Sequence, residues 1–176
     1  MAQQRKSSEN GEPIAGNGSY CLPGGMPGAM SPPKELSLQI LETPSQVTVL
    51  FEFYGTYRVI HLNQEHPLHP DPTSLGYSVG HWEGDTLVVD TIGLTPNPLD
   101  PTDTAQHLVE RIRRTGKDTL EDLVTIDDPK TYTKAWTRRI NLKYFPGSTI
   151  GEFVCDNQRN GVDADGHTKV ELKSSK

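Results

Sequence analysis

The chain has 176 residues and a formal net charge of −6. This length suits one domain of ordinary size, with a core that needs no disulfide or metal to hold it together. The negative charge disfavours nucleic acid and anionic membranes as partners, because both bind basic surfaces. The apolar runs are too short to cross a bilayer. A small molecule is therefore the expected partner, and a homo-oligomer stays open.

Three regions follow from the composition along the chain. Residues 1–34 are expected to form an N-terminal arm, which is polar and flexible at first and rich in Gly and Pro over 20–34, where proline removes backbone donors. This arm either closes one end of the domain or lies on its surface as a strap. Residues 35–157 form the folded domain, and residues 158–176 are a polar C-terminal tail.

Export and redox state are left open. Residues 1–13 contain no apolar segment of the kind found in a secretory leader, so the protein is either cytoplasmic or exported with its leader removed. Cys21 and Cys155 either form one disulfide, which suits an exported protein, or are two free thiols.

The domain is composed of short strand-like segments separated by turn residues. A helix competes with a strand over 107–114, but the similar segment after the turn at 115–117 favours a hairpin. Sequential antiparallel strands in this number usually close on themselves, because closure removes exposed edges. The sequence predicts an all-β fold, an antiparallel up-and-down, lipocalin-like β-barrel of about 8–9 strands, with a two-sheet sandwich as the alternative. The expected strands cover residues 36–41, 46–53, 57–62, 77–83, 86–92, 107–114, 119–126, 131–145 and 150–156.

The hairpin over residues 77–92 is the clearest element. Gly84 and Asp85 fall where a two-residue turn needs residues that tolerate positive φ. Tyr77, His81 and Asp90 then share one face, and Trp82 lies on the other. The register of this turn pairs Glu83 with Thr86, Trp82 with Leu87, His81 with Val88, and Val79 with Asp90.

Five motifs are distributed over about residues 20 to 157. They are Cys21-Leu22-Pro23-Gly24-Gly25-Met26-Pro27, Arg58-Val59-Ile60-His61, Gly80-His81-Trp82-Glu83-Gly84-Asp85-Thr86-Leu87-Val88-Val89-Asp90-Thr91, Glu110-Arg111, and Thr125-Ile126-Asp127-Asp128-Pro129-Lys130-Thr131-Tyr132. With these motifs the chain resembles a largely uncharacterised bacterial family whose members are often exported. The resemblance implies a similar architecture and export but carries no activity.

His81 and Asp90 are the first catalytic candidates, because a carboxylate beside an imidazole holds its tautomer and makes a general base near neutral pH. Tyr77 would line the same cavity if this face points inward. Arg58 would stabilise developing negative charge on a substrate oxygen or, alternatively, form a salt bridge with Glu52. If His81 faces solvent instead, Asp90 merely satisfies a neighbouring donor.

Other residues are expected to contact the substrate or to remain on the surface. A charged strand around His107 is more typical of a solvated face than of a catalytic one. His61, His66 and His69 are weak metal candidates without a recognised spacing. The expected substrate-binding residues are Glu52, Tyr54, Trp82, His107, Trp136 and Tyr144.

No nucleotide-binding or nucleophile-elbow motif occurs, so we expect no cofactor. The first hypothesis is a cofactor-independent acid/base isomerase, cyclase or lyase that binds a mostly apolar small molecule in the barrel. A non-catalytic lipocalin-like carrier of a hydrophobic ligand is the alternative. A structural domain with a filled core is the third hypothesis.

Overall fold

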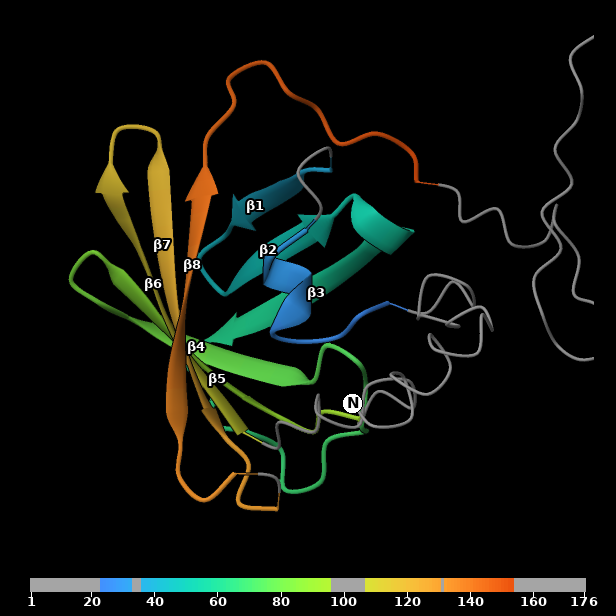
Figure 1. Ribbon diagram of the computed structural model, residues 1–176, viewed down its shortest axis with the longest axis vertical. Coiled ribbons are helices and arrows are strands. Elements are labelled where there is room, and N and C mark those ends of the chain that lie inside the picture. The colour runs from blue at the N-terminus through green and yellow to red at the C-terminus, as the bar shows by residue number, and fades with distance from the viewer. Residues whose placement is uncertain (1–22, 33–35, 96–106, 131, 154–176) are drawn as a thin grey trace, which may run out of the picture.

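A single curled sheet makes up most of the fold in the computed structural model, which describes residues 23–32, 36–95, 107–130 and 132–153. The sheet has eight strands in sequence order and bends into a half-barrel (Figure 1), which confirms the all-β, barrel-like prediction. The described residues also form two three-residue 3-10 helices, η2 (Gly28–Met30) and η3 (Phe53–Gly55). The strands are β1 (Leu38–Glu42), β2 (Gln46–Phe51), β3 (Thr56–Leu62), β4 (Tyr77–Glu83), β5 (Thr86–Ile92), β6 (His107–Gly116), β7 (Thr119–Asp127) and β8 (Trp136–Lys143).

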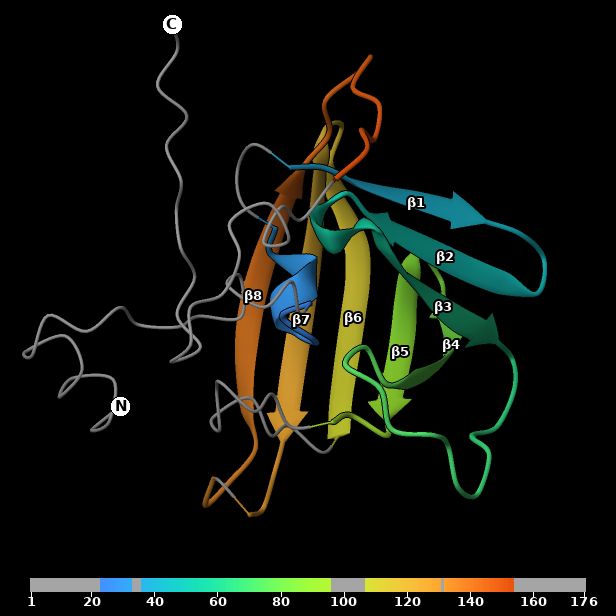
Figure 2. The ribbon, with the colours of Figure 1, turned by 90° about the vertical axis from the view of Figure 1, so that its right-hand side faces the viewer.

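The sheet departs from the expected up-and-down order at one position. Strands β3 and β4 are parallel, with Ile60 opposite Ser78, whereas every other neighbouring pair is antiparallel. A parallel pair needs a long connection that returns the chain to the other end of the sheet. Residues 63–76 provide this connection, and Figure 2 shows them as a wide loop beside β3 and β4.

The hairpin of β4 and β5 has the register that its sequence predicts, from Glu83 opposite Thr86 to Val79 opposite Asp90. A strand was expected over 150–156, but residues 150–153, the part that the structure describes, are irregular. The apolar side chain of Phe153 packs instead against Phe53 and Tyr54, at ring-centroid distances of 5.3 and 5.4 Å. Aromatic packing therefore explains the apolar pattern there.

The concave side of the sheet holds the core, and the N-terminal arm packs into it. Met26 and Met30 are 2% and 0% exposed and belong to the same apolar cluster as Val49, Ile60 and Val124. Figure 2 shows the arm within the curl of the sheet. The flexible thioether side chain suits such an irregular gap. The described part of the arm is therefore a component of the core.

The two faces of the β4–β5 hairpin are inverted relative to our expectation. Ser78, Val89 and Thr91 point into the concave side and are buried, while His81 and Asp90 lie on the convex side. The sequence pattern of β5 does not show which face is inside, because its residues 86–89 are buried on the concave and on the convex face alike. No helix in the described part of the chain has the length and apolarity to span a membrane.

Candidate functional site

The convex face carries a group of polar side chains, which we call the His–Asp cluster: His66, Tyr77, Asp90 and His107. Tyr77 and Asp90 lie on β4 and β5, and His107 is the first residue of β6. Because Asp90 pairs with Val109, His107 is its diagonal neighbour on the same face. His66 comes from the loop that connects β3 and β4.

One carboxylate holds both imidazoles of this cluster. The Nε2 atom of His66 lies 2.7 Å from Oδ1 of Asp90, and Nε2 of His107 lies 2.9 Å from Oδ2. The side chains of His107 and Asp90 are 40% and 39% exposed, and that of His66 is 20% exposed. When each Nε2–H donates to Asp90, each Nδ1 keeps a lone pair that can accept a proton.

Asp90 is held as an anion. Partial burial acts to raise its pKa, but hydrogen bonds from His107 and His66 outweigh this effect and leave the pKa below its ordinary value. The carboxylate therefore keeps its charge across the neutral range, where it can stabilise a positive charge that forms on either ring.

Two aromatic contacts support the cluster. The ring of Tyr77 stacks on His61 at a centroid distance of 4.9 Å and meets His66 edge-on at 6.0 Å. The Nδ1 atom of His66 is buried and has no hydrogen-bond partner among the described residues. A buried ring nitrogen with a free lone pair is unusual in a purely structural histidine.

The expected His81–Asp90 dyad is not formed. His81 lies on the exposed end of β4, where its Nε2 is 3.3 Å from Glu83, and Arg111 also binds Glu83 at 2.7 Å. Hydrogen bonds from Arg111 and from His81 lower the pKa of the exposed Glu83 carboxylate. Both oxygens of Asp90 are already occupied by the two other histidines. A shared face was correctly predicted, but it did not determine which imidazole reaches the carboxylate.

A second polar group, the inner cluster, lies on the concave side directly behind the first. Arg58 is its centre: Nε donates to the Ser78 hydroxyl at 2.9 Å, and one terminal nitrogen donates to Thr91 at 2.7 Å. Both terminal nitrogens bind the carboxylate of Glu110. Every member is at most 2% exposed, and the members are Arg58, Ser78, Thr91, Glu110 and Asp122.

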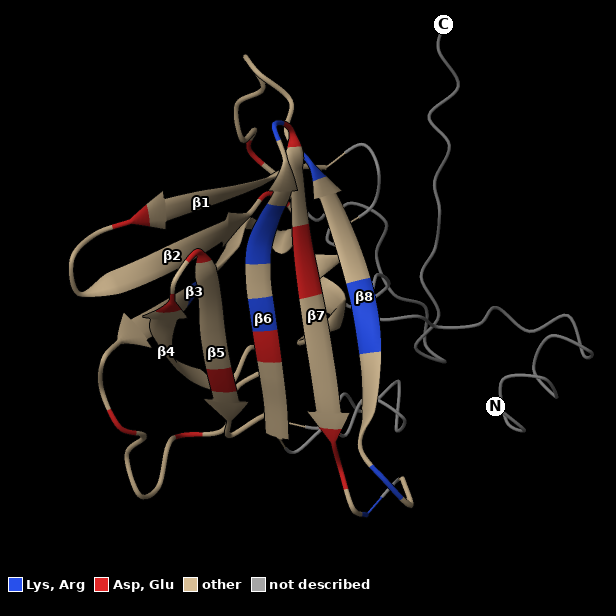
Figure 3. Cartoon of the chain, turned by 90° about the vertical axis from the view of Figure 1, so that its left-hand side faces the viewer, with Lys and Arg blue, Asp and Glu red and all other residues tan. Residues whose placement is uncertain are grey.

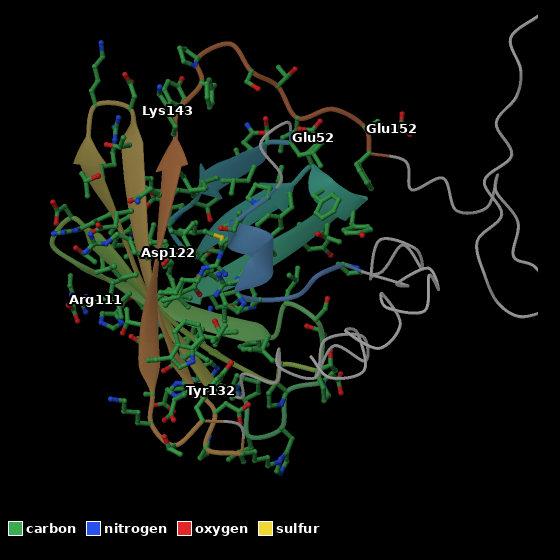
Figure 4. The ribbon with its side chains drawn as sticks, in the orientation of Figure 1. Glu52, Arg111, Asp122, Tyr132, Lys143 and Glu152 are labelled. Atoms are coloured by element: carbon green, nitrogen blue, oxygen red, sulfur yellow. The ribbon has the colours of Figure 1, made fainter. Side chains whose placement is uncertain are left out.

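Asp122 is the unsatisfied member of the inner cluster. Neither carboxyl oxygen has a hydrogen-bond partner within normal distance among the described residues. Burial raises the pKa of Asp122 to about 8, and the nearby negative charge of Glu110 adds to the rise, while Arg58 opposes it. Asp122 is therefore mostly protonated at neutral pH. Figure 4 shows it nearer to the arm, whereas Arg111 lies on the outer side of the curl.

Several expected site residues lie apart from both clusters. Glu52 is one of them: its carboxylate accepts the Ser37 N–H at 2.8 Å, while Arg58 pairs with Glu110 instead. Tyr54 lies in η3 with a φ of 62°, and burial raises its pKa. Three of the side chains expected to bind the substrate are exposed, because they lie near strand ends or beyond them: Trp82 45%, Trp136 38% and Tyr144 62%.

The three histidines considered as metal ligands have different surroundings. His61 stacks on Tyr77, His66 binds Asp90, and His69 is exposed. Within the described ranges, no group of three or more His, Cys, Asp or Glu side chains is arranged to hold a metal ion. Cys21 and Cys155 lie outside the described residues, as do residues 1–22 and the tail from 158.

Contacts that only the folded chain provides determine the His–Asp cluster. His66 approaches Asp90 through the parallel connection, and the position of His107 depends on the register of β5 and β6, which a long loop separates. Turn chemistry fixes register only across short loops.

Comparison of the chain with protein-family models, with curated proteins and with solved structures finds no match.

Proposed function

We propose that the protein is a cofactor-independent enzyme that moves a proton on a small organic molecule, as an isomerase, cyclase or lyase does. The observation that carries this proposal is the pair of imidazoles held by Asp90 at 2.7 and 2.9 Å on a partly exposed surface. A carboxylate that orients an imidazole is the usual arrangement of a general base.

His107 is the proposed base, because its ring is 40% exposed and can be approached from solvent. Its Nδ1 takes a proton from a substrate carbon or hydroxyl, and the Nε2–H bond to Asp90 stabilises the imidazolium that forms. Asp90 stays ionised throughout this step. A base of this kind typically contributes on the order of 10²–10⁴-fold in rate.

His66 is proposed to hold Asp90 in place, because its Nε2 binds the carboxylate and its Nδ1 is buried away from a substrate. The exposed ring of His107 suits a 1,3-proton shift, in which it removes a proton and, in its protonated form, returns one at a different substrate atom. The net change is the position of a hydrogen and a double bond, so no oxidant or reductant is needed. Tyr77 supplies a hydroxyl donor on the same face for a developing oxyanion.

The substrate is proposed to be mostly apolar. Val79 lies opposite Asp90 in the hairpin, and the largely buried side chains of Val79 and Val88, which are 9% and 8% exposed, make the convex face beside the cluster apolar. Arg58, which we expected to contact the substrate, has no role in this proposal because it is buried and bound to Glu110.

The proposal is tested by proton exchange, which can be followed before any product is identified. Ketones, enones and β-hydroxy acids are incubated with the protein in D₂O, and loss of C–H signals is followed by NMR. We expect at least one compound class to exchange faster than in buffer. Asp90→Asn and His107→Gln should each lower that rate by about 10²-fold or more.

His81→Ala is the matched control. It removes an imidazole from the same face, but one that binds Glu83 and lies outside the cluster. Its exchange rate should equal that of the wild type. Equal rates for the wild type and Asp90→Asn with every compound would contradict the proposal, provided that both proteins show the same folded circular dichroism spectrum.

A carrier of an apolar ligand is the second candidate, and the apolar concave face favours it. Met26 and Met30 of the arm already pack there, so a ligand would have to displace them. A carrier should bind an apolar fluorescent probe in place of the arm. Asp90→Asn should leave the affinity for this probe unchanged.

A further inference from the structure

Within the described part of the chain, the half-barrel has two edge strands, β1 and β8, and they differ in chemistry. Strand β8 carries Arg138, Arg139 and Lys143, whereas β1 has the sequence Leu-Gln-Ile-Leu-Glu with its single charge at the end. Figure 3 shows this contrast between the blue segments of β8 and the largely tan β1. Charged side chains on an edge prevent pairing with other strands. Only β8 is protected in this way.

The unprotected strand also exposes large apolar side chains. Ile40 is 39% exposed and Leu41 is 45% exposed, on opposite faces of the strand. No proline or bulge interrupts β1, because its register with β2 runs unbroken from Leu38 to Glu42. An edge of this kind is a template for another strand.

The direction of the backbone groups of β1 follows from two hydrogen bonds at its ends. The Thr43 N–H donates to the Gln46 carbonyl, and the Glu52 N–H donates to the Ser37 carbonyl. Inward bonding alternates along an antiparallel pair, so the odd-numbered residues of β1 bond to β2. The N–H and C=O groups of Leu38, Ile40 and Glu42 therefore point to the free edge.

This arrangement is self-complementary. If a second β1 pairs antiparallel about a two-fold axis at Ile40, Ile40 lies opposite its own copy and Leu38 lies opposite Glu42 of the other chain. All three outward residues then occupy hydrogen-bonded positions, which gives about six main-chain hydrogen bonds. The two Glu42 side chains oppose leucines, so no like charges meet.

We propose that β1 is a homodimer interface, at which two copies of this chain join their sheets edge to edge with Ile40 on the two-fold axis. A closed two-fold pairing uses both β1 edges, so that among the described strands the charged β8 edges alone stay unpaired. It therefore ends in a dimer and not in a fibre. This inference does not depend on the proposed enzymatic activity.

Light scattering coupled to size-exclusion chromatography of the full chain tests the interface. We expect a mass about twice the chain mass of 19.5 kDa at micromolar concentrations. Ile40→Lys places two lysines directly opposite each other and should give a monomer, and Ile40→Glu should do the same. An equimolar mixture of these two variants should recover the dimer, because opposite charges then meet on the axis.

Gln39→Lys is the matched control, since it adds the same charge on the same strand but lies opposite Leu41 of the partner copy. It should remain a dimer. Ile40→Pro gives a second test that removes one outward N–H and no bond to β2, and it should yield a monomer with an unchanged circular dichroism spectrum. A monomeric wild type, a dimeric Ile40→Lys protein, or a Lys/Glu mixture that stays monomeric would each overturn the proposal.

Discussion

The imidazole of His66 lies 2.7 Å from the carboxylate of Asp90, a residue 24 positions further along the chain. This contact ties the loop between β3 and β4 to the convex face of β5. The same carboxylate reaches His107 on the neighbouring strand. Three separate segments therefore converge on one side chain, and the site depends on the parallel connection that the loop makes.

Asp90 should stabilise the fold in a pH-dependent manner. Its folded-state pKa is lowered, so its contribution is present above the ordinary value of 3.8 and is lost as the pH falls through the folded-state pKa. At neutral pH, Asp90→Asn should lower the free energy of unfolding by about 1 kcal/mol, a modest value because the group is partly exposed. Urea denaturation checks this difference, which should disappear as the pH falls through the folded-state pKa of Asp90. Asp85→Asn, in the exposed turn, should show no such difference.

Arg58 should be the most costly polar residue to remove. Its loss leaves Glu110 buried without a partner, and breaking a buried pair on one side typically costs about 3–5 kcal/mol. Arg58→Met should therefore destabilise strongly in chemical denaturation. The double variant with Glu110→Gln should cost less than the sum of the two single changes. An additive result would show that the pair is not energetically coupled.

Asp122 should make the protein less stable as the pH rises. Its folded-state pKa is about 8 against an ordinary value of 3.8, so the folded state binds more protons between these limits. The linked loss of stability is up to about 1.4 kcal/mol per pH unit and stops above the folded-state pKa. Asp122→Asn resembles the protonated form and should remove this slope. If the unfolding free energies of the wild type and Asp122→Asn changed with pH in parallel, the raised pKa of Asp122 would be refuted.

Gly76 and Gly84 have similar positive φ values, +69° and +62°, but different surroundings. A Cβ at Gly76 would lie 2.7 Å from Thr91 and 2.8 Å from the Ile92 carbonyl, whereas nothing lies within 4 Å at Gly84. Gly84→Ala should cost about 1 kcal/mol from backbone strain alone. Gly76→Ala should cost about 2 kcal/mol more, because the backbone must also shift. Equal melting temperatures of the Gly76→Ala and Gly84→Ala proteins would contradict the crowding at Gly76.

Local patterns predicted eight of the strands and the central hairpin. Alternation and the Gly84-Asp85 turn predicted the register of β4 and β5 residue by residue, since a two-residue loop leaves no other pairing. The same patterns did not show which face of that hairpin is inside, because β5 is apolar on both. They also predicted a strand over 150–156, but its described part, 150–153, is irregular and Phe153 there packs against two aromatic rings.

The chain by itself determined the β class, the approximate number of strands and the residues that share a face within each hairpin, because these depend on neighbours in sequence. Only the tertiary structure decided that Asp90 binds His66 and His107 and that Arg58 binds Glu110. These partners come from different strands and loops, and long connections leave their register undetermined. The half-barrel brings them together because its curvature directs one face of each strand to the arm and the other to solvent.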